Sequence, residues 1–111
     1  MAYRISAKRI QDPAGLRAAL QSAIQLEHAT LPLYLTAMYS IKDGSNTGAY
    51  SILRSVVMEE MLHFALACNI LNAVGGSPVI NTPEFIPKFP GGLPMGIAGG
   101  KQFHLRKLSI D

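Results

Sequence analysis

The stretch that decides the fold is SVVMEEMLHFALACNIL, residues 55–71. Its apolar residues recur at helical spacing. Two glutamates and a histidine, Glu59, Glu60 and His63, stand in the middle of this apolar run. An ionised carboxylate that is buried without a partner is costly. The stretch therefore predicts a core helix whose acids have a partner inside the protein.

The apolar spacing predicts two long helices that are joined by a short, turn-rich connector. The first helix spans about residues 13–42, and Asp12 followed by Pro13 provides a good start for it. It contains Pro32, where the helix can kink. The second helix spans about residues 49–74. Because the connector is short, the two helices are expected to run antiparallel.

Residues 75–111 are predicted to form an irregular tail, because they are rich in proline and glycine. The pair Gly75-Gly76 is a strong stop signal for the helix that precedes it. At the other end of the chain, an extended piece is predicted at Tyr3–Ile5. The sequence thus predicts one all-α domain over residues 1–111, built on a long antiparallel two-helix hairpin.

Composition excludes several functional classes. The chain has 111 residues, a net charge of +3 and a pI near 9.2, and its basic residues form no dense stripe. We therefore expect no nucleic-acid binding. Polar residues interrupt the charge-poor segment 18–41, and the N-terminus lacks a secretory signal, so no membrane span is expected. The single cysteine, Cys68, cannot form an intramolecular disulfide, and we expect a cytoplasmic protein.

The charges that remain in the two helices are few. Between Arg17 and Lys42 the only formally charged side chain is Glu27, and between Arg54 and Glu84 the only ones are Glu59 and Glu60. A helix that is apolar nearly all round is buried nearly all round. A lone hairpin cannot bury both helices in this way. We therefore expect further helices, either from a second copy of the chain or from sequence that is absent here.

Three of the polar side chains are predicted to converge. Glu60 and His63 are three residues apart and project from one face of the second helix. Glu27 lies at a similar height on the first helix, at about 1.5 Å per residue. A cation would relieve the cost of burying these carboxylates next to an imidazole. Glu27, Glu60 and His63 therefore predict one half of a di-iron or di-manganese carboxylate site.

Two other interpretations stay open at this point. The acids can form a buried, hydrogen-bonded polar layer, or Glu59 and Glu60 can line a water-filled interface. Glu59 lies about 100° around the helix from Glu60, so it is predicted to support the ligands or to contact a partner rather than to bind the metal. His28 points away from the Glu27 face and is predicted to pack or to support the ligands.

Two long motifs, AIQLEHATLPLYLTAMYSIK (residues 23–42) and EEMLHFALACNILNAVGGSP (residues 59–78), resemble the ferritin-like domain family that includes the iminophenyl-pyruvate dimer synthases. The tail, with PKFPGGLPMG and FHLRKLSID, is also similar, so the resemblance covers about residues 15–111. It implies a ferritin-like four-helix architecture in which Glu27, Glu60 and His63 match the ligands of the first half. Members are associated with oxidative chemistry on amino-acid-derived substrates.

The chain departs from the family pattern by stopping before a third and fourth helix. The hairpin would then be half of a four-helix bundle. The resemblance leaves two explanations, a missing C-terminal half or a homodimer or higher oligomer. Two copies related by a C2 axis would supply four glutamates and two histidines.

The leading functional hypothesis is a di-metal protein in which Glu60 bridges the metals, Glu27 is a terminal carboxylate and His63 supplies nitrogen. Iron is the expected metal, with manganese as the alternative. The site would activate O₂ or peroxide to oxidise a small organic substrate, and no separate catalytic residue is assigned. The alternatives are a ferroxidase or iron-storage protein and a non-catalytic helical remnant or interaction module.

Overall fold

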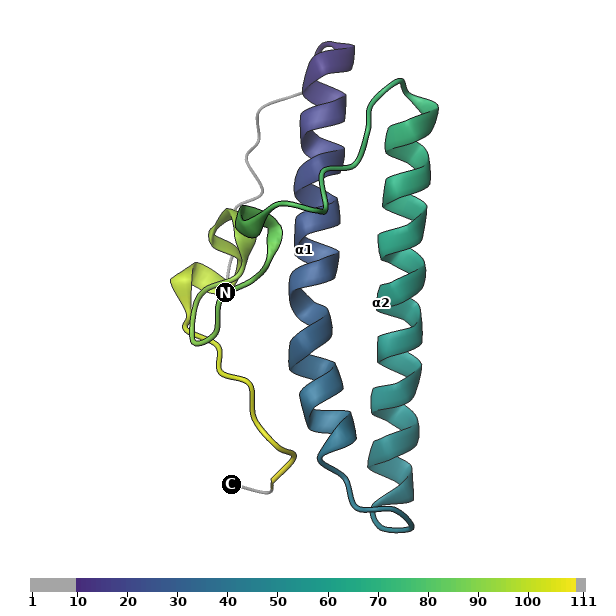
Figure 1. The fold of residues 1–111 in the computed structure, drawn as a ribbon, viewed down its shortest axis with the longest axis vertical. Coiled ribbons are helices and arrows are strands. Elements are labelled where there is room, and N and C mark those ends of the chain that lie inside the picture. Colours follow the sequence, from purple (N-terminus) through teal and green to yellow (C-terminus); the bar gives the residue numbers. More distant parts are fainter. Residues whose placement is uncertain (1–9, 110–111) are drawn as a thin grey trace.

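The structure is a computed structural model that describes residues 10–109. Two long helices, α1 (Pro13–Tyr39) and α2 (Thr47–Ala73), lie side by side as an antiparallel hairpin (Figure 1). The all-α hairpin predicted from the sequence is confirmed. The extended piece predicted at Tyr3–Ile5 lies outside the described residues.

The start of α1 follows the predicted chemistry. The Asp12 carboxylate accepts a hydrogen bond from the Gly15 backbone N–H at 2.6 Å, and Pro13 occupies the first helical position. The helix continues through Pro32 and ends at Tyr39 rather than at about residue 42. The connector is correspondingly longer than expected at this end, and α2 begins at Thr47 rather than at about residue 49.

Two consecutive glycines end α2. The Gly75 N–H donates to the Asn72 carbonyl at 3.1 Å, and the Gly76 N–H donates to the Leu71 carbonyl at 2.9 Å. Gly75 has φ +83°, which glycine adopts without strain. A Cβ at Gly76 would collide with the Leu71 side chain. These contacts form a Schellman motif, which turns the chain back toward α1.

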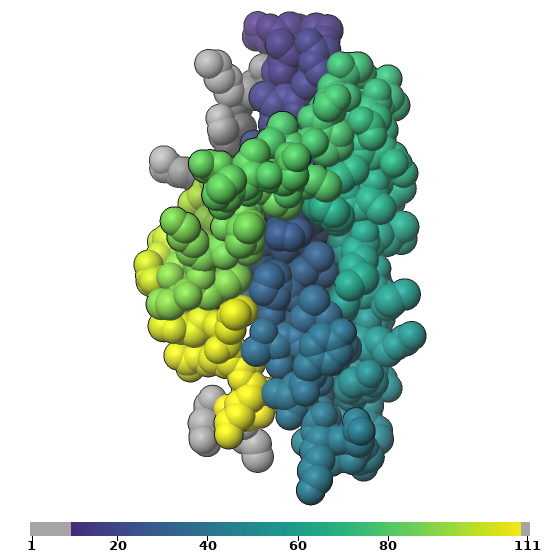
Figure 2. Space-filling model, in the orientation of Figure 1, coloured from purple at the N-terminus to yellow at the C-terminus, as the bar shows by residue number. Residues whose placement is uncertain are grey.

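The tail then packs against α1, and Figure 2 shows it covering the side of α1 away from α2. The Gln21 side chain holds the tail by two hydrogen bonds of 2.9 Å. Its Nε2 donates to the Val79 carbonyl, and its Oε1 accepts from the Val79 N–H. The Arg17 guanidinium donates to the Val74 carbonyl at 3.4 Å. Further along, the tail contains two short 3₁₀ segments, η1 (Pro83–Phe85) and η2 (Pro94–Gly100).

The core is small and lies where α1, α2 and the tail meet. One cluster of buried residues there consists of Ile24 at 0%, Leu71 at 2% and Phe85 at 7% exposed. The outer sides of α2, in contrast, are not buried, and large apolar residues there remain exposed to solvent. These residues are Ile52, Met58, Met61, Leu62, Leu66 and Ile70. The hairpin thus buries only part of its apolar surface.

Helix α2 is the one helix within residues 10–109 that is long and apolar enough to cross a membrane, with a mean hydropathy of 1.2. A core helix of a soluble protein can have the same length and composition. In a bilayer, Glu59, Glu60 and His63 would lie near the centre of the membrane, where ionisable groups are costly. The apolar sides of α2 therefore fit contacts with other protein better than contacts with lipid.

Candidate metal centre

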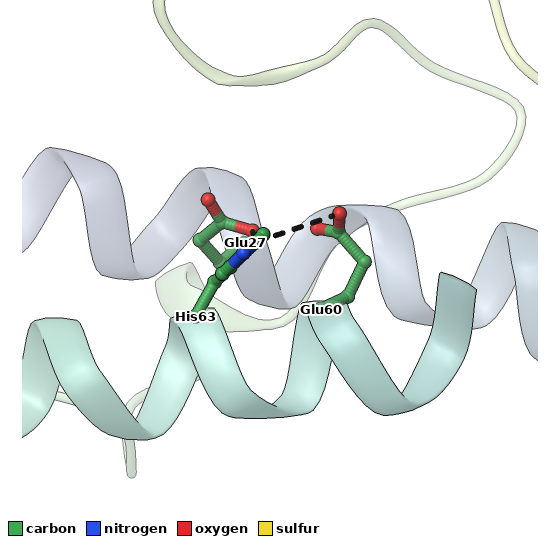
Figure 3. Close-up of side chains that lie close together, drawn as sticks. All are labelled: Glu27, Glu60 and His63. Atoms are coloured by element: carbon green, nitrogen blue, oxygen red, sulfur yellow. Dashed lines mark ion pairs between the residues drawn. The ribbon is translucent and has the colours of Figure 1, made fainter. Parts of the chain in front are cut away.

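The three predicted ligands meet between the two helices. Glu27 projects from α1, and Glu60 and His63 project from α2 toward it (Figure 3). The Nδ1 atom of His63 lies 3.7 Å from Glu27 Oε2 and 3.8 Å from Glu60 Oε1. One donor atom from each residue lies within 4.8 Å of the other two. This spacing allows all three side chains to approach one ion.

The electrostatics of the cluster also favour a cation. The pKa of Glu27 is raised to about 7, first because the carboxyl is partly buried and then because Glu60 lies beside it. The nearby imidazole of His63 acts in the opposite direction. Without a metal, Glu27 is therefore about half protonated near pH 7. A divalent cation can replace that proton, and carboxylate and imidazole donors suit iron and manganese.

A fourth residue, Thr30, belongs to the cluster and was not predicted from the sequence. Its hydroxyl lies 3.1 Å from Glu60 Oε2 and 3.0 Å from the Glu27 backbone carbonyl. A hydrogen bond from Thr30 orients the Glu60 carboxylate toward Glu27. Its position three residues after Glu27, on the same helical face, is the signal that could have identified it.

The two other candidate residues lie outside the cluster. Glu59 is exposed on α2, to one side of Glu60. His28 stacks against two aromatic rings, with centroid distances of 4.5 Å to Phe85 and 5.7 Å to Phe64. Burial lowers the pKa of His28, and its Nδ1 has no hydrogen-bond partner among the described residues. In this structure His28 therefore packs the tail onto the hairpin.

The cluster is open on one side. The side chains of Glu60 and Glu27 are 20% and 27% exposed, and that of His63 is 49% exposed. Two carboxylates and one imidazole are also fewer ligands than the six that two bundled half-sites provide. The described residues therefore place three possible metal ligands in a cluster that is open to solvent on one side.

Comparison with known proteins decides the family. The model of the Ferritin-like family matches residues 20–111, which is most of the chain. The chain belongs to the Ferritin-like family. Proteins of the Ferritin-like fold are typically soluble, and they often bind iron. The family agrees with a carboxylate-type di-metal protein in general, and the Glu27, Glu60 and His63 cluster is the group that fits such a site. Searches of curated proteins and of solved structures find no match.

Proposed function

We propose that this Ferritin-like protein is a di-metal carboxylate oxidoreductase, with iron as its metal and manganese as the alternative. The observation that carries the proposal is the convergence of Glu27, Glu60 and His63 from two helices within 4.8 Å. Helical bundles with dinuclear sites place Glu-x-x-His on one helix opposite a glutamate on its neighbour. The same arrangement relates α2 to α1 here.

Each residue has a distinct role in this proposal. Glu27 and Glu60 would hold the metal through their carboxylate oxygens, and His63 would supply a nitrogen ligand. Thr30 holds the Glu60 carboxylate by its hydrogen bond of 3.1 Å. Bound iron would supply the electron transfer that O₂ or peroxide needs in order to oxidise an organic substrate. The apolar helices around the cluster would limit the access of water.

A groove beside the cluster supports the proposal that the substrate is an organic molecule. It lies between α1 and the tail, has a volume of about 450 Å³ and is lined by Thr30, whose hydroxyl bonds Glu60. Its walls also include apolar and basic side chains, and none of its lining residues is an Asp or Glu. These residues include Leu33, Leu93, Phe103, Arg106 and Lys107. A small substrate with an apolar part and an acidic group, as in amino-acid derivatives, fits this lining.

The proposal also includes a substrate class and a cellular compartment. The resemblance to iminophenyl-pyruvate dimer synthases favours an amino-acid-derived substrate. Cys68 is the single cysteine of the sequence, and it cannot form an intramolecular disulfide. We therefore propose that the protein is located in the reducing cytoplasm.

A ferroxidase or iron-storage role is the second candidate. It is favoured by the exposed Met58, Met61 and Leu62, because such apolar surface fits a higher-order assembly. Iron oxidation without any organic substrate, in a large oligomer, would support this role. A non-catalytic module would instead be metal-free, with its acids protonated or bound to water.

Metal analysis of the purified protein tests the proposal. We expect wild-type protein to bind iron, and Glu60→Ala to lose most of it. Glu84→Ala removes an exposed acid from η1, far from the cluster in sequence, and serves as the matched control. Metal content that is substoichiometric and equal in all three proteins would contradict a metal centre at Glu60.

A further inference from the structure

Six residues of α2 recur at alternating intervals of four and three, which is the spacing of a coiled-coil seam. We call these residues the seam: Ile52, Val56, Glu59, His63, Leu66 and Ile70. Helix α1 packs along α2, and the tail contacts α2 through Phe85, next to Phe64 and Leu71. Within residues 10–109 the seam is left largely open, with Ile52 67%, Leu66 47% and Ile70 49% exposed.

The seam is symmetric about the level of residue 61. If a second, antiparallel α2 lay along it with a two-fold axis at this level, Ile52 would lie opposite Ile70 of the second helix. Val56 would lie opposite Leu66, and Glu59 would lie opposite His63. Apolar residues thus meet apolar residues, and a carboxylate meets an imidazole. A seam that complements itself in this way fits a second copy of the same chain.

The metal ligands lie at the same level. Glu60 is the middle residue of α2, and His63 is one turn further on, so residue 61 lies between the two ligands. An axis at this level brings two half-sites face to face and overlaps almost the full length of both helices. The apolar seam and the open half-site therefore require the same axis. An unrelated partner would need neither the symmetry nor this shared centre.

We infer that a second copy of this chain docks along the seam in antiparallel orientation and completes the metal centre. The two copies together present four carboxylates and two imidazoles, from Glu27, Glu60 and His63 of each. This inference rests on the proposed function, because the pairing of the half-sites has meaning only if they hold metal. It names the partner of that same site.

The docking also gives Glu59 a role. In the structure, the Nδ1 atom of His63 faces Glu27 and Glu60, which leaves the Nε2 atom free to bond on the open side. In the dimer, Glu59 of the second copy lies opposite His63 and accepts a hydrogen bond from that nitrogen. A carboxylate on the second ring nitrogen fixes the orientation of a metal-binding imidazole. Glu59 is thus a positioning residue that acts on the other copy.

Charge placement across the seam tests the register. Ile52→Glu/Ile70→Glu puts like charges opposite each other at both ends, and we expect this variant to be monomeric in analytical ultracentrifugation. Ile52→Glu/Ile70→Lys puts opposite charges together only in the antiparallel register. We expect this second variant to remain a dimer. Both variants carry two charged side chains at the same exposed positions, so they differ only in the sign of one charge.

Met58→Glu/Met61→Glu is the matched control off the seam. Both methionines are exposed, at 54% and 44%, and lie at least about 120° around α2 from Ile70. We expect this variant to remain a dimer. A wild-type monomer would overturn the inference, and so would equal association of the two Ile52 and Ile70 variants. All measurements are made in EDTA, so that their outcome does not depend on metal.

Glu59→Gln tests the positioning role. We expect the dimer to persist and the metal affinity to fall by about 10- to 100-fold, the usual effect of losing such a contact. Unchanged affinity in a persistent dimer would overturn this role.

The dimer and the proposed metal-dependent function can be contradicted independently of each other. A monomer that binds metal through Glu60 contradicts the dimer alone, whereas a dimer that binds no metal contradicts the proposed function alone.

Discussion

The helices α1 and α2 are equally long, at 27 residues each, yet the structure covers them very differently. From Leu20 to Met38, α1 has no exposed residue, because α2 covers one side and the tail covers another. In contrast, α2 exposes large apolar residues on every side that α1 does not cover. Helix α1 is therefore better covered than α2.

The difference has a chemical basis in the sequence. Polar groups on α1 bind backbone that follows α2, because Gln21 bonds Val79 of the tail and Arg17 donates to the carbonyl of Val74, the residue that caps α2. The seam of α2 has few such groups, and its two polar members are an acid and a histidine. An apolar helix face that offers few hydrogen bonds to an irregular segment is better covered by the apolar face of another helix. The candidate site therefore lies at the border between the covered and the open parts of the molecule.

The largest expected effect contrasts two leucines of α2. Leu71 is 2% exposed in the core, whereas Leu66 is 47% exposed in the seam. Leu71→Ala should lower the free energy of unfolding by about 2–5 kcal/mol at any protein concentration. Leu66→Ala should act mainly through association, so its cost should depend on protein concentration. Urea unfolding over a range of concentrations measures both, and equal, concentration-independent losses would remove the distinction.

The second prediction concerns pH and the metal. Because the pKa of Glu27 is raised to about 7 from 4.5, metal must displace a proton below pH 7. Metal affinity should fall by up to about tenfold for each pH unit below 7. In metal-free protein the folding stability depends on pH in the opposite direction to the metal affinity. Glu27 then stabilises the fold fully below pH 4.5, and this contribution is lost as pH rises through 7.

Manganese titrations and thermal unfolding at several pH values measure these two trends. A Glu27→Gln variant is the control, because it cannot exchange this proton. Identical pH dependence in wild type and Glu27→Gln would show that Glu27 does not contribute.

The third prediction tests the covered side. Gln21→Ala removes both hydrogen bonds to Val79, which should cost about 1–2 kcal/mol in the docking of the tail. Hydrogen exchange at the Val79 amide should become faster, while amides in α2 stay protected. Gln25→Ala, on the same helix, is the control and should leave Val79 unchanged. Slow exchange at Val79 in Gln21→Ala would mean that the two Gln21 hydrogen bonds do not hold the tail in place.

The smallest effect is expected at His28. Burial lowers its pKa below 6.5, so the fold disfavours the charged imidazole and loses stability as pH falls below about 6.5. His28→Phe should retain the packing against Phe64 and Phe85 and remove this loss. We expect stability near pH 7.5 to change by less than about 1 kcal/mol. A steeper loss of stability at acid pH in His28→Phe would contradict this assignment.

The sequence predicted the two helices and the cluster because both follow from short-range geometry. Glu60 and His63 share a face by their spacing, and Glu27 reaches them because the hairpin is antiparallel. The capping by Asp12 and the stop at Gly75-Gly76 are equally local. Each of these features is fixed by a few neighbouring residues.

The path of the tail was not predictable in the same way. The contacts of Gln21 with Val79, and of His28 with Phe85, join residues that are more than fifty positions apart. The hydrogen bond from Thr30 to Glu60 likewise depends on how α1 and α2 are rotated against each other. Periodicity shows that a helix is apolar, and it does not show which partner covers each side.

A metal centre shared by two copies can be located by anomalous diffraction at the iron edge, from crystals of protein loaded with ferrous iron. We expect anomalous density between Glu27, Glu60 and His63, next to the same three residues of a second copy. Iron bound elsewhere on the chain, or no ordered iron in loaded crystals, would contradict it.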